Sequence, residues 1–223
     1  MKIKYLGHSS FNITGKGLYG EQVTVVTDPF DKKDVGLPYS KQTADIVTIS
    51  HDHADHNAIQ NIEGTEPDNY KLITTPGEYE IKGVRIFGVK SFHDDKQGKE
   101  RGDNTIFIYD FAEARVAHLG DLGHKLDSNQ QEALENVDII IVPVGGIYTV
   151  DAKTALEVAE AEDPKIIIPM HYKTDKHAAT YSQLGTLQDF MKEAGTQTEP
   201  QKDLSIKTRS DLPLELSIIP LMV

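Results

Sequence analysis

Short apolar runs rich in β-branched residues recur along the whole chain, and they constrain its fold more than any other feature. Ten such runs have the composition of buried strands: IKYL, VTVVT, DIVTIS, KLITT, VRIFGV, TIFIYD, RVAHL, DIIIVPV, KIIIP and ELSII. Helical patterns are fewer and come later, over residues 128–135, 154–162 and 181–194. The sequence therefore predicts a strand-rich α/β protein.

The order of these elements predicts two packed sheets with outer helices. In the first half, strands follow one another through turns such as that at residues 15–17, which indicates a meander, whereas strand and helix alternate from Val116 onward. A chain of 223 residues can enclose both halves around one core, so we expect a single domain over residues 1–223. The polar stretch 93–104 is the longest candidate for a mobile loop.

The composition excludes several classes of function. The chain has no cysteine, so any metal must bind to histidine and carboxylate groups. The net charge of -12 disfavours nucleic acid as a partner. The first residues, MKIKYLGHSS, alternate like a strand and do not resemble a signal peptide, and no window approaches the length of a membrane span. A cytoplasmic location is the resulting expectation.

Residues 46–56 contain the densest group of metal-binding side chains. They read IVTISHDHADH, in which an apolar run leads directly into three histidines and two aspartates. Imidazole and carboxylate groups suit zinc and its neighbours, and a tight turn after a strand can direct alternate side chains to two nearby points. This spacing predicts that His51 and His53 bind one ion and that Asp55 and His56 bind another.

Further ligand-type residues follow other apolar runs, namely Asp28, His93, Asp121 and His171. In open α/β sheets the strand ends on one side converge to form the site, so residues far apart in sequence can meet there. A histidine-rich loop in solvent is the alternative for the segment around His51, and it predicts no such recurrence. Taken singly, His93 could be an exposed loop residue, and Asp28 and Asp121 could belong to turns.

The segment HDHADH matches the HxHxDH signature, and the chain thereby resembles the metallo-β-lactamase superfamily. His93, Asp121 and His171 follow in the order that this superfamily uses, and Asp28 in TDPF resembles its early aspartate. The resemblance implies a four-layer αβ/βα sandwich of two mixed β-sheets flanked by helices. It also implies that the metals lie at one edge of the paired sheets.

The same resemblance implies a role for each ligand. One ion would bind His51, His53 and His93; the other would bind Asp55, His56 and His171; and Asp121 would bridge both. Two divalent ions are implied, zinc first, with manganese and iron as alternatives. A water between the ions would become the nucleophile, Asp55 would orient it or receive its proton, and Asp28 would fix a ligand histidine by a hydrogen bond.

Four short segments resemble, more narrowly, the branch of small metal-dependent hydrolases related to ascorbate-6-phosphate lactonase: LGHSSF, TDPF, PVGGIYT and PMHY. This implies hydrolysis of a small-molecule lactone, ester or phosphodiester. Three other functions stay open: a di-iron redox protein, a non-catalytic metal-stabilised binding protein, and an RNA-processing enzyme, which the net charge disfavours. A homo-oligomer is compatible with the sequence.

Several residues outside the motif are also candidates. His8 at the end of the first run could contact substrate, donate a proton or be a structural histidine. His118 is expected in the core, and His124 could support a ligand beside Asp121. The glycines at 145–146 permit a tight loop that would bring Tyr148 and Thr149 to the substrate, and His177 is expected on the surface.

Overall fold

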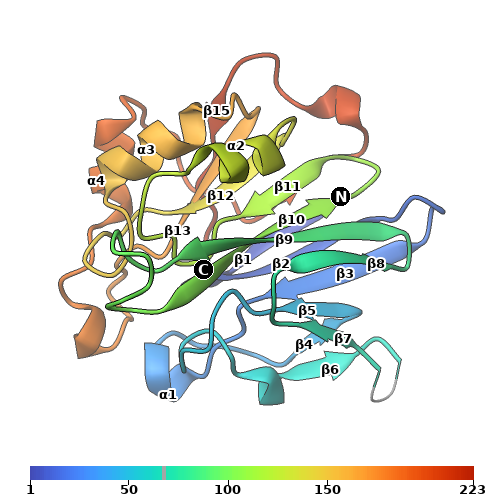
Figure 1. Ribbon diagram of the computed structural model, residues 1–223, viewed down its shortest axis with the longest axis horizontal. Coiled ribbons are helices and arrows are strands. Elements are labelled where there is room, and N and C mark those ends of the chain that lie inside the picture. Colours follow the sequence, from blue (N-terminus) through green and yellow to red (C-terminus); the bar gives the residue numbers. More distant parts are fainter. Residues whose placement is uncertain (67–68) are drawn as a thin grey trace.

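Two mixed β-sheets lie face to face in the middle of the molecule (Figure 1). The computed structural model describes residues 1–66 and 69–223. The first sheet has the strand order β14 (Leu204–Ser205), β1 (Lys2–Gly7), β2 (Ser10–Lys16), β3 (Gln22–Thr27), β5 (Ile46–Thr48) and β7 (Lys71–Ile73). The second has the order β15 (Ser217–Ile218), β13 (Ile166–Met170), β12 (Ile139–Pro143), β11 (Arg115–His118), β10 (Asp103–Asp110), β9 (Val84–Phe92) and β8 (Gly77–Ile81).

Each sheet joins an antiparallel part to a parallel part. In the first sheet β14, β1, β2 and β3 pair antiparallel, while β3, β5 and β7 run parallel. In the second sheet β8 to β11 pair antiparallel, and β11, β12, β13 and β15 run parallel. Parallel neighbours need crossover connections, which the helices α2 (Ser128–Leu134) and α3 (Ala152–Glu160) supply here.

The alternation of side chains along each strand explains how the layers pack. In β5, Ile46 points into the core shared by the two sheets, whereas Val47 points to the outer face. The hydroxyls of Thr48 on β5 and Tyr109 on β10 form a buried hydrogen bond of 2.6 Å that joins the sheets. Strands β12 and β13 are buried along their whole length, because both of their faces are covered.

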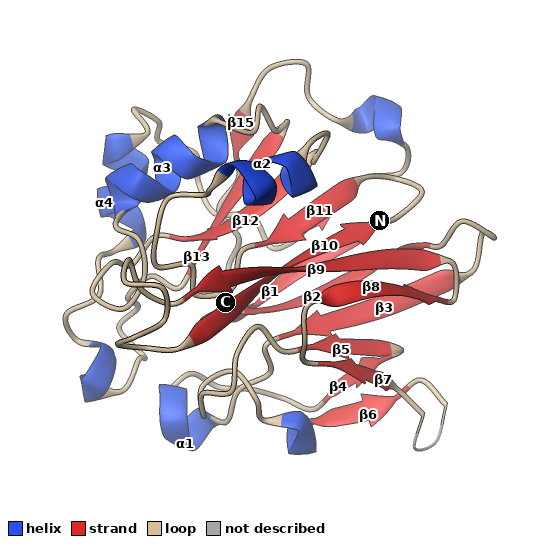
Figure 2. Ribbon diagram, viewed as in Figure 1, coloured by secondary structure: helices blue, strands red, loops and turns tan. Residues whose placement is uncertain are grey.

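The outer layers differ between the two sheets. Helices α2, α3 and α4 (Leu187–Glu193) cover the second sheet (Figure 2). The first sheet is covered by the short α1 (Lys32–Val35), a 3-10 turn at Ile59–Asn61 and the parallel pair β4 (Gln42–Ala44) and β6 (Ile62–Gly64). Among the described residues, no helix is both long enough and apolar enough to cross a membrane.

The predicted fold class is confirmed, and each of the ten predicted runs contains a strand. Strands β2, β4, β6, β8 and β14 were not predicted, because they are short or polar. The turn expected at residues 15–17 is wrong in detail: β2 continues to Lys16, and the chain reverses where the Gly20 N–H donates to the Gly17 carbonyl. The helix expected over 181–194 is limited to α4, preceded by a 3-10 turn at Ala179–Tyr181.

The loop after β9 is more ordered than its polar sequence suggests. The buried carboxylate of Asp94 accepts hydrogen bonds from four backbone N–H groups of the loop, those of Lys96, Gly98, Glu100 and Arg101. One side chain thus replaces the backbone pairing that an irregular segment lacks. The loop is wound around Asp94 rather than extended into solvent.

A second buried carboxylate, that of Asp45, joins three segments. Asp45 lies between β4 and β5 and accepts hydrogen bonds from the Thr24 backbone N–H, the Thr65 hydroxyl and the Lys82 ammonium group. Burial alone would raise the pKa of Asp45, but the hydrogen bonds from Lys82, Thr65 and Thr24 outweigh it, and the pKa is lowered. The ionised form is therefore the one that stabilises the fold.

We predict that Asp45→Asn lowers the free energy of unfolding by about 1–3 kcal/mol at pH 7, because buried donors lose a charged acceptor. Folding lowers this pKa, so the stabilisation is present above the unfolded value of about 3.9 and is lost as the pH falls below it. The difference between wild type and variant in urea unfolding should shrink toward pH 3. Asp95→Asn, at an exposed carboxylate, is the control, and equal losses in both variants would contradict the role of Asp45.

Candidate metal centre

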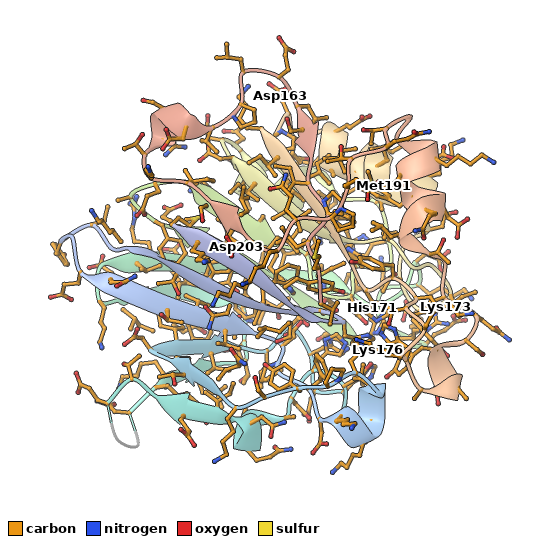
Figure 3. The ribbon with its side chains drawn as sticks, turned by 180° about the vertical axis from the view of Figure 1, so that it is seen from behind. Asp163, His171, Lys173, Lys176, Met191 and Asp203 are labelled. Atoms are coloured by element: carbon orange, nitrogen blue, oxygen red, sulfur yellow. The ribbon has the colours of Figure 1, made fainter. Side chains whose placement is uncertain are left out.

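The candidate site forms where strands of both sheets end at one edge of the sandwich. His8 follows β1, Asp28 follows β3, His93 follows β9 and His171 follows β13. The backbone N–H of His171 donates to the His8 carbonyl at 2.8 Å, so the ends of β1 and β13 are tied together. Seen from behind, His171, Lys173 and Lys176 gather near one another, away from Asp163 and Asp203 (Figure 3).

Three of these residues have unusual backbone conformations. His8, Asp28 and His171 have φ values of 54°, 38° and 55°, in the left-handed region that non-glycine residues seldom adopt. The surrounding structure must hold such conformations, and they concentrate at functional sites. In each case a sharp turn directs the side chain toward the same edge.

The carboxylate of Asp121 lies at the centre of the cluster. Its Oδ2 atom is 3.3 Å from His56 Nε2, 3.3 Å from His93 Nε2 and 3.2 Å from His171 Nε2. Burial would raise the pKa of Asp121, but the neighbouring His171 and His56 outweigh it and hold the pKa well below its usual value. A single carboxylate oxygen thus faces three imidazoles from the segments that follow three separate strands, β5, β9 and β13.

The backbone around Asp121 leaves little freedom to this carboxylate. Its N–H donates to Asn104 Oδ1 at 3.0 Å, and the Ser9 hydroxyl donates to its Oδ1 at 3.2 Å. Gly120 has a φ of 57°, and a Cβ atom there would lie 2.3 Å from Asn104 Oδ1. Only glycine therefore lets the chain pass Asn104 closely enough to place Asp121.

The potential ligand atoms fall into groups that suit two ions. One group is His51, His53 and His93; a second is His8, Asp55, His56 and His171; and a third joins His51 and His56 through Asp121. Within each group all the ligand atoms lie within 4.8 Å of one another. The structure thus brings together all seven residues expected as ligands, and it adds His8 to the second group.

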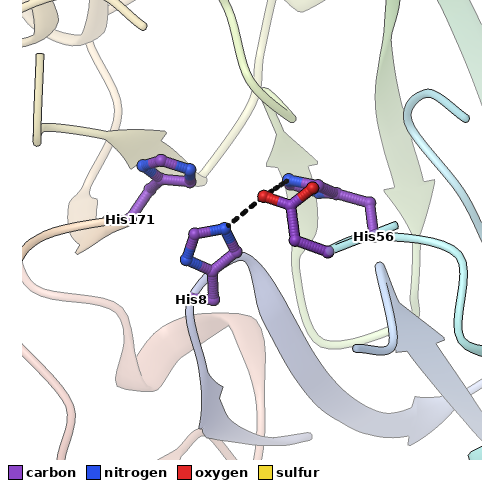
Figure 4. A group of neighbouring side chains, drawn as sticks. His8, His56 and His171 are labelled. Atoms are coloured by element: carbon purple, nitrogen blue, oxygen red, sulfur yellow. Dashed lines mark hydrogen bonds and ion pairs between the residues drawn. The ribbon is translucent and has the colours of Figure 1, made fainter. Parts of the chain in front are cut away.

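His8 and His56 lie on either side of one carboxylate, that of Asp55 (Figure 4). His8 Nε2 is 3.0 Å from Asp55 Oδ2, and His56 Nε2 is 3.6 Å from the same oxygen. The Tyr181 hydroxyl donates to this oxygen as well, at 2.9 Å. Two of these three groups, His8 and Tyr181, lie outside the HDHADH segment, so other parts of the chain hold Asp55 as well.

Asp28 fixes the orientation of two histidines. Its Oδ2 atom is 3.1 Å from His56 Nδ1 and accepts a hydrogen bond from the Ser50 hydroxyl at 2.7 Å. Because that hydroxyl donates to Asp28, it accepts the hydrogen bond from His51 Nδ1, at 2.9 Å. Both imidazoles therefore direct Nδ1 away from the cluster and turn Nε2 toward it, where an ion could bind.

The residues present fit a metal ion. Among the described residues, His51 Nε2 and His56 Nε2 are buried nitrogens with no hydrogen-bond partner, a costly state unless something else fills it. Burial, followed by the charge of His56, lowers the pKa of His51 to about 2, so this imidazole is neutral as metal binding requires. Neutral imidazole with carboxylate and without thiolate is a ligand set for zinc, manganese or iron.

A cavity of about 260 Å³ opens onto the cluster. Its wall contains His53, Asp55, His93, Asp121 and His171 together with Arg101, Tyr148, Thr180 and Tyr181. A second cavity of about 420 Å³ shares His53 and Arg101 with the first. A small substrate can therefore reach the cluster from these openings.

Three histidines beyond the motif lie in different surroundings. His8 is fully buried and is not among the residues that line the cavity, which favours the structural role among those expected for it. His177, expected on the surface, lies against His8 with a ring centroid distance of 5.6 Å. His124 bonds to the backbone of Phe92 and Lys125 instead of supporting a ligand.

The structure agrees better with the expectations for His118 and for the loop at residues 145–149. His118 is buried, as expected, with Nε2 2.8 Å from the Ser9 carbonyl. A Cβ atom at Gly145 would lie 2.1 Å from the His171 carbonyl, so the loop expected there does pass close to the site. Of its two polar residues, Tyr148 lines the cavity and Thr149 does not.

Sequence reasoning missed Tyr181 and Arg101. Tyr181 lies in a 3-10 turn and Arg101 in a polar loop, and neither follows an apolar run. Only the position of Arg101 eight residues after His93, in the loop that begins there, could have drawn attention to it.

The fold and the cluster together define a class: an αβ/βα sandwich that carries a histidine and aspartate metal site at one edge of its sheets. Comparison with known proteins gives the family. Residues 2–171 match the family model described as the beta-lactamase superfamily domain. The chain belongs to this superfamily and, within it, to the family of UPF0173 metal-dependent hydrolases.

Individual relatives agree with this assignment. The chain is 32% identical to a UPF0173 metal-dependent hydrolase of Staphylothermus marinus, over 77% of this chain and 83% of the relative. A Thermotoga maritima crystal structure, described as a candidate Zn-dependent hydrolase of the metallo-beta-lactamase superfamily, is 36% identical with a TM-score of 0.77, over 99% of this chain and 97% of that one. Igni18, a metallo hydrolase of Ignicoccus hospitalis, shares the fold at 22% identity and a TM-score of 0.59, over 91% of this chain and 97% of that one.

We predict that Asp28→Asn lowers the affinity for metal by about 10- to 100-fold, because the amide cannot hold His56 and Ser50 as the carboxylate does. Asparagine tolerates the left-handed backbone at this position, so the fold should persist. Titration with zinc against a chromophoric chelator measures the affinity. The control is Asp52→Asn in the same segment, at an exposed carboxylate that bonds Asn57. An unchanged affinity in Asp28→Asn would contradict the orienting role.

Proposed function

We propose that this chain is a hydrolase that uses two divalent metal ions to cleave a small-molecule lactone, ester or phosphodiester. The observation that carries the proposal is the Asp121 oxygen, within 3.3 Å of His56, His93 and His171 in the wall of a cavity. Zinc is the ion that we propose first, and manganese and iron suit the same ligands. We also propose that residues 1–223 act as one domain, since one core cluster extends from Ile3 to Leu221.

The assignment of ligands follows the two groups described above. We propose His51, His53 and His93 for one ion, Asp55, His56 and His171 for the other, and Asp121 between them. When bound, such a pair of ions would lower the pKa of a water molecule toward about 7 and polarise the oxygen of a carbonyl or phosphoryl group. The choice of a lactone among the substrates rests on the resemblance of LGHSSF and PMHY to the lactonase branch.

The side chains around Asp55 would handle the proton that hydrolysis releases. Asp55 lines the cavity, and its Oδ2 accepts the hydrogen bond from Tyr181 at 2.9 Å. We propose that Asp55 receives the proton and that the Tyr181 hydroxyl, on the same wall, then gives up its hydrogen bond to Asp55 and donates one to the leaving oxygen instead. Because His8 is buried behind Asp55, its part is to orient this carboxylate through the 3.0 Å contact.

Replacing a proposed ligand tests the function directly. His53→Ala should reduce kcat/KM for a lactone or ester substrate by at least about 100-fold, since it removes one of three ligands of an ion. His124→Gln, which changes a histidine bonded to the backbone outside the cluster, is the control. Hydrolysis that persists undiminished in His53→Ala would overturn the proposed function.

The role of the tyrosine has its own test. Tyr181→Phe should lower kcat by about 100-fold while the metal content stays at the wild-type level, because the hydrogen-bond donor to the leaving oxygen is removed and every proposed metal ligand remains. Tyr19→Phe, at an exposed tyrosine that bonds Glu80, controls for the substitution itself. A variant that loses metal together with activity would instead make Tyr181 a support of the site.

A further inference from the structure

Arg101 differs from every other arginine of the chain. The sequence contains four arginines, and three of them pair with carboxylates: Arg85 and Arg115 with Asp110, and Arg209 with Asp138. Arg101 has no carboxylate within 4.0 Å among residues 1–66 and 69–223. A guanidinium group without a carboxylate is available to an anion from solution.

The place of this guanidinium is next to the proposed metal site. Arg101 and His53 both line the 260 Å³ cavity and the 420 Å³ cavity beside it. The side chain lies over the Tyr148 ring, with Cζ 5.9 Å from the ring centroid, and its Nη2 donates to the Ile147 carbonyl at 3.1 Å. These contacts fix the planar group and leave its other N–H donors for a ligand.

The loop that carries Arg101 is fixed as well. The Arg101 backbone N–H donates to Asp94 Oδ2 at 2.7 Å, and the Gly102 carbonyl accepts the backbone N–H of His93 at 3.1 Å. The loop on both sides of Arg101 is thereby tied to His93, a residue of the metal cluster, and to its neighbour Asp94. The loop after β9 therefore fixes the positions of both His93 and Arg101, between which a ligand could bind.

The charges around the cavities favour an anion. The chain as a whole has a net charge of -12, so an anionic substrate needs local cations, and Arg101 would add one to the two proposed metal ions. The other basic side chain in the larger cavity, Lys90, pairs with Asp103 at 3.2 Å. In the smaller cavity Arg101 is the one lysine or arginine among the lining residues that the structure describes.

We propose that Arg101 binds a carboxylate or phosphate group of the substrate, so that the enzyme acts on small esters or lactones that carry such an anionic group. This inference rests on the proposed hydrolytic function and narrows its substrate class. Arg101 holds the anionic group while the bond that is cleaved lies over the cluster.

A matched pair of substrates tests the specificity. Mono-4-nitrophenyl glutarate carries a free carboxylate, and 4-nitrophenyl valerate is its neutral counterpart of the same chain length. In the metal-loaded protein, Arg101→Gln should raise KM for the glutarate ester by about 10- to 100-fold, the loss of a charged hydrogen bond, and leave the valerate ester unaffected. Lys99→Gln, an exposed cation of the same loop, should change neither. Equal effects of Arg101→Gln on the two esters would overturn the inference.

A binding measurement separates this inference from the proposed function. Isothermal titration of the metal-loaded wild type, Arg101→Gln and Lys99→Gln with glutarate and with glycerol phosphate does not require turnover. We expect Arg101→Gln to bind at least one of them about 10-fold or more weakly than the other two proteins, and the ligand that loses more identifies the anionic group. Equal dissociation constants in all three proteins would overturn the role of Arg101, whereas failure to hydrolyse any substrate, with the binding difference intact, would count against the proposed function alone.

Discussion

The contact of one Asp121 oxygen with three imidazoles is the feature on which the site depends. His56, His93 and His171 come from the segments that follow three separate strands, and their Nε2 atoms lie within 3.3 Å of the same atom. They meet there only because the parallel and antiparallel parts of both sheets stop at one edge. The close passage of Gly120 past Asn104 then decides where the carboxylate points.

Burying so many titratable groups together costs free energy of folding, and particular features of the backbone and side chains hold these groups in place. Left-handed turns at His8, Asp28 and His171 place side chains that ordinary strand ends would direct elsewhere. Asp28 holds His51 and His56 with unpartnered Nε2 atoms, which a cation would satisfy. Metal binding and folding are therefore expected to be coupled in this protein, since ligands that repel or desolvate one another become favourable around an ion.

Much of this arrangement could be predicted from the sequence, because apolar runs and the residues that end them are local features. Each of the ten apolar runs contains a strand, and the seven ligand candidates lie close together at one edge of the sheets, as their positions after apolar runs predicted. Strands β2 and β8 have too few apolar residues to stand out. Tyr181 and Arg101 reach the site from irregular segments, whose path depends on tertiary contacts such as those of Asp94, and no periodicity encodes that path.

The most direct test of the account is the metal content per chain, measured by elemental analysis on gently purified protein and again after reconstitution. Because Asp121 lies between two groups of ligands, we predict about two ions of zinc, or of manganese or iron, for each chain. If the reconstituted protein holds only one ion per chain, or none, Asp121 does not bridge two ions, and the proposed chemistry is contradicted.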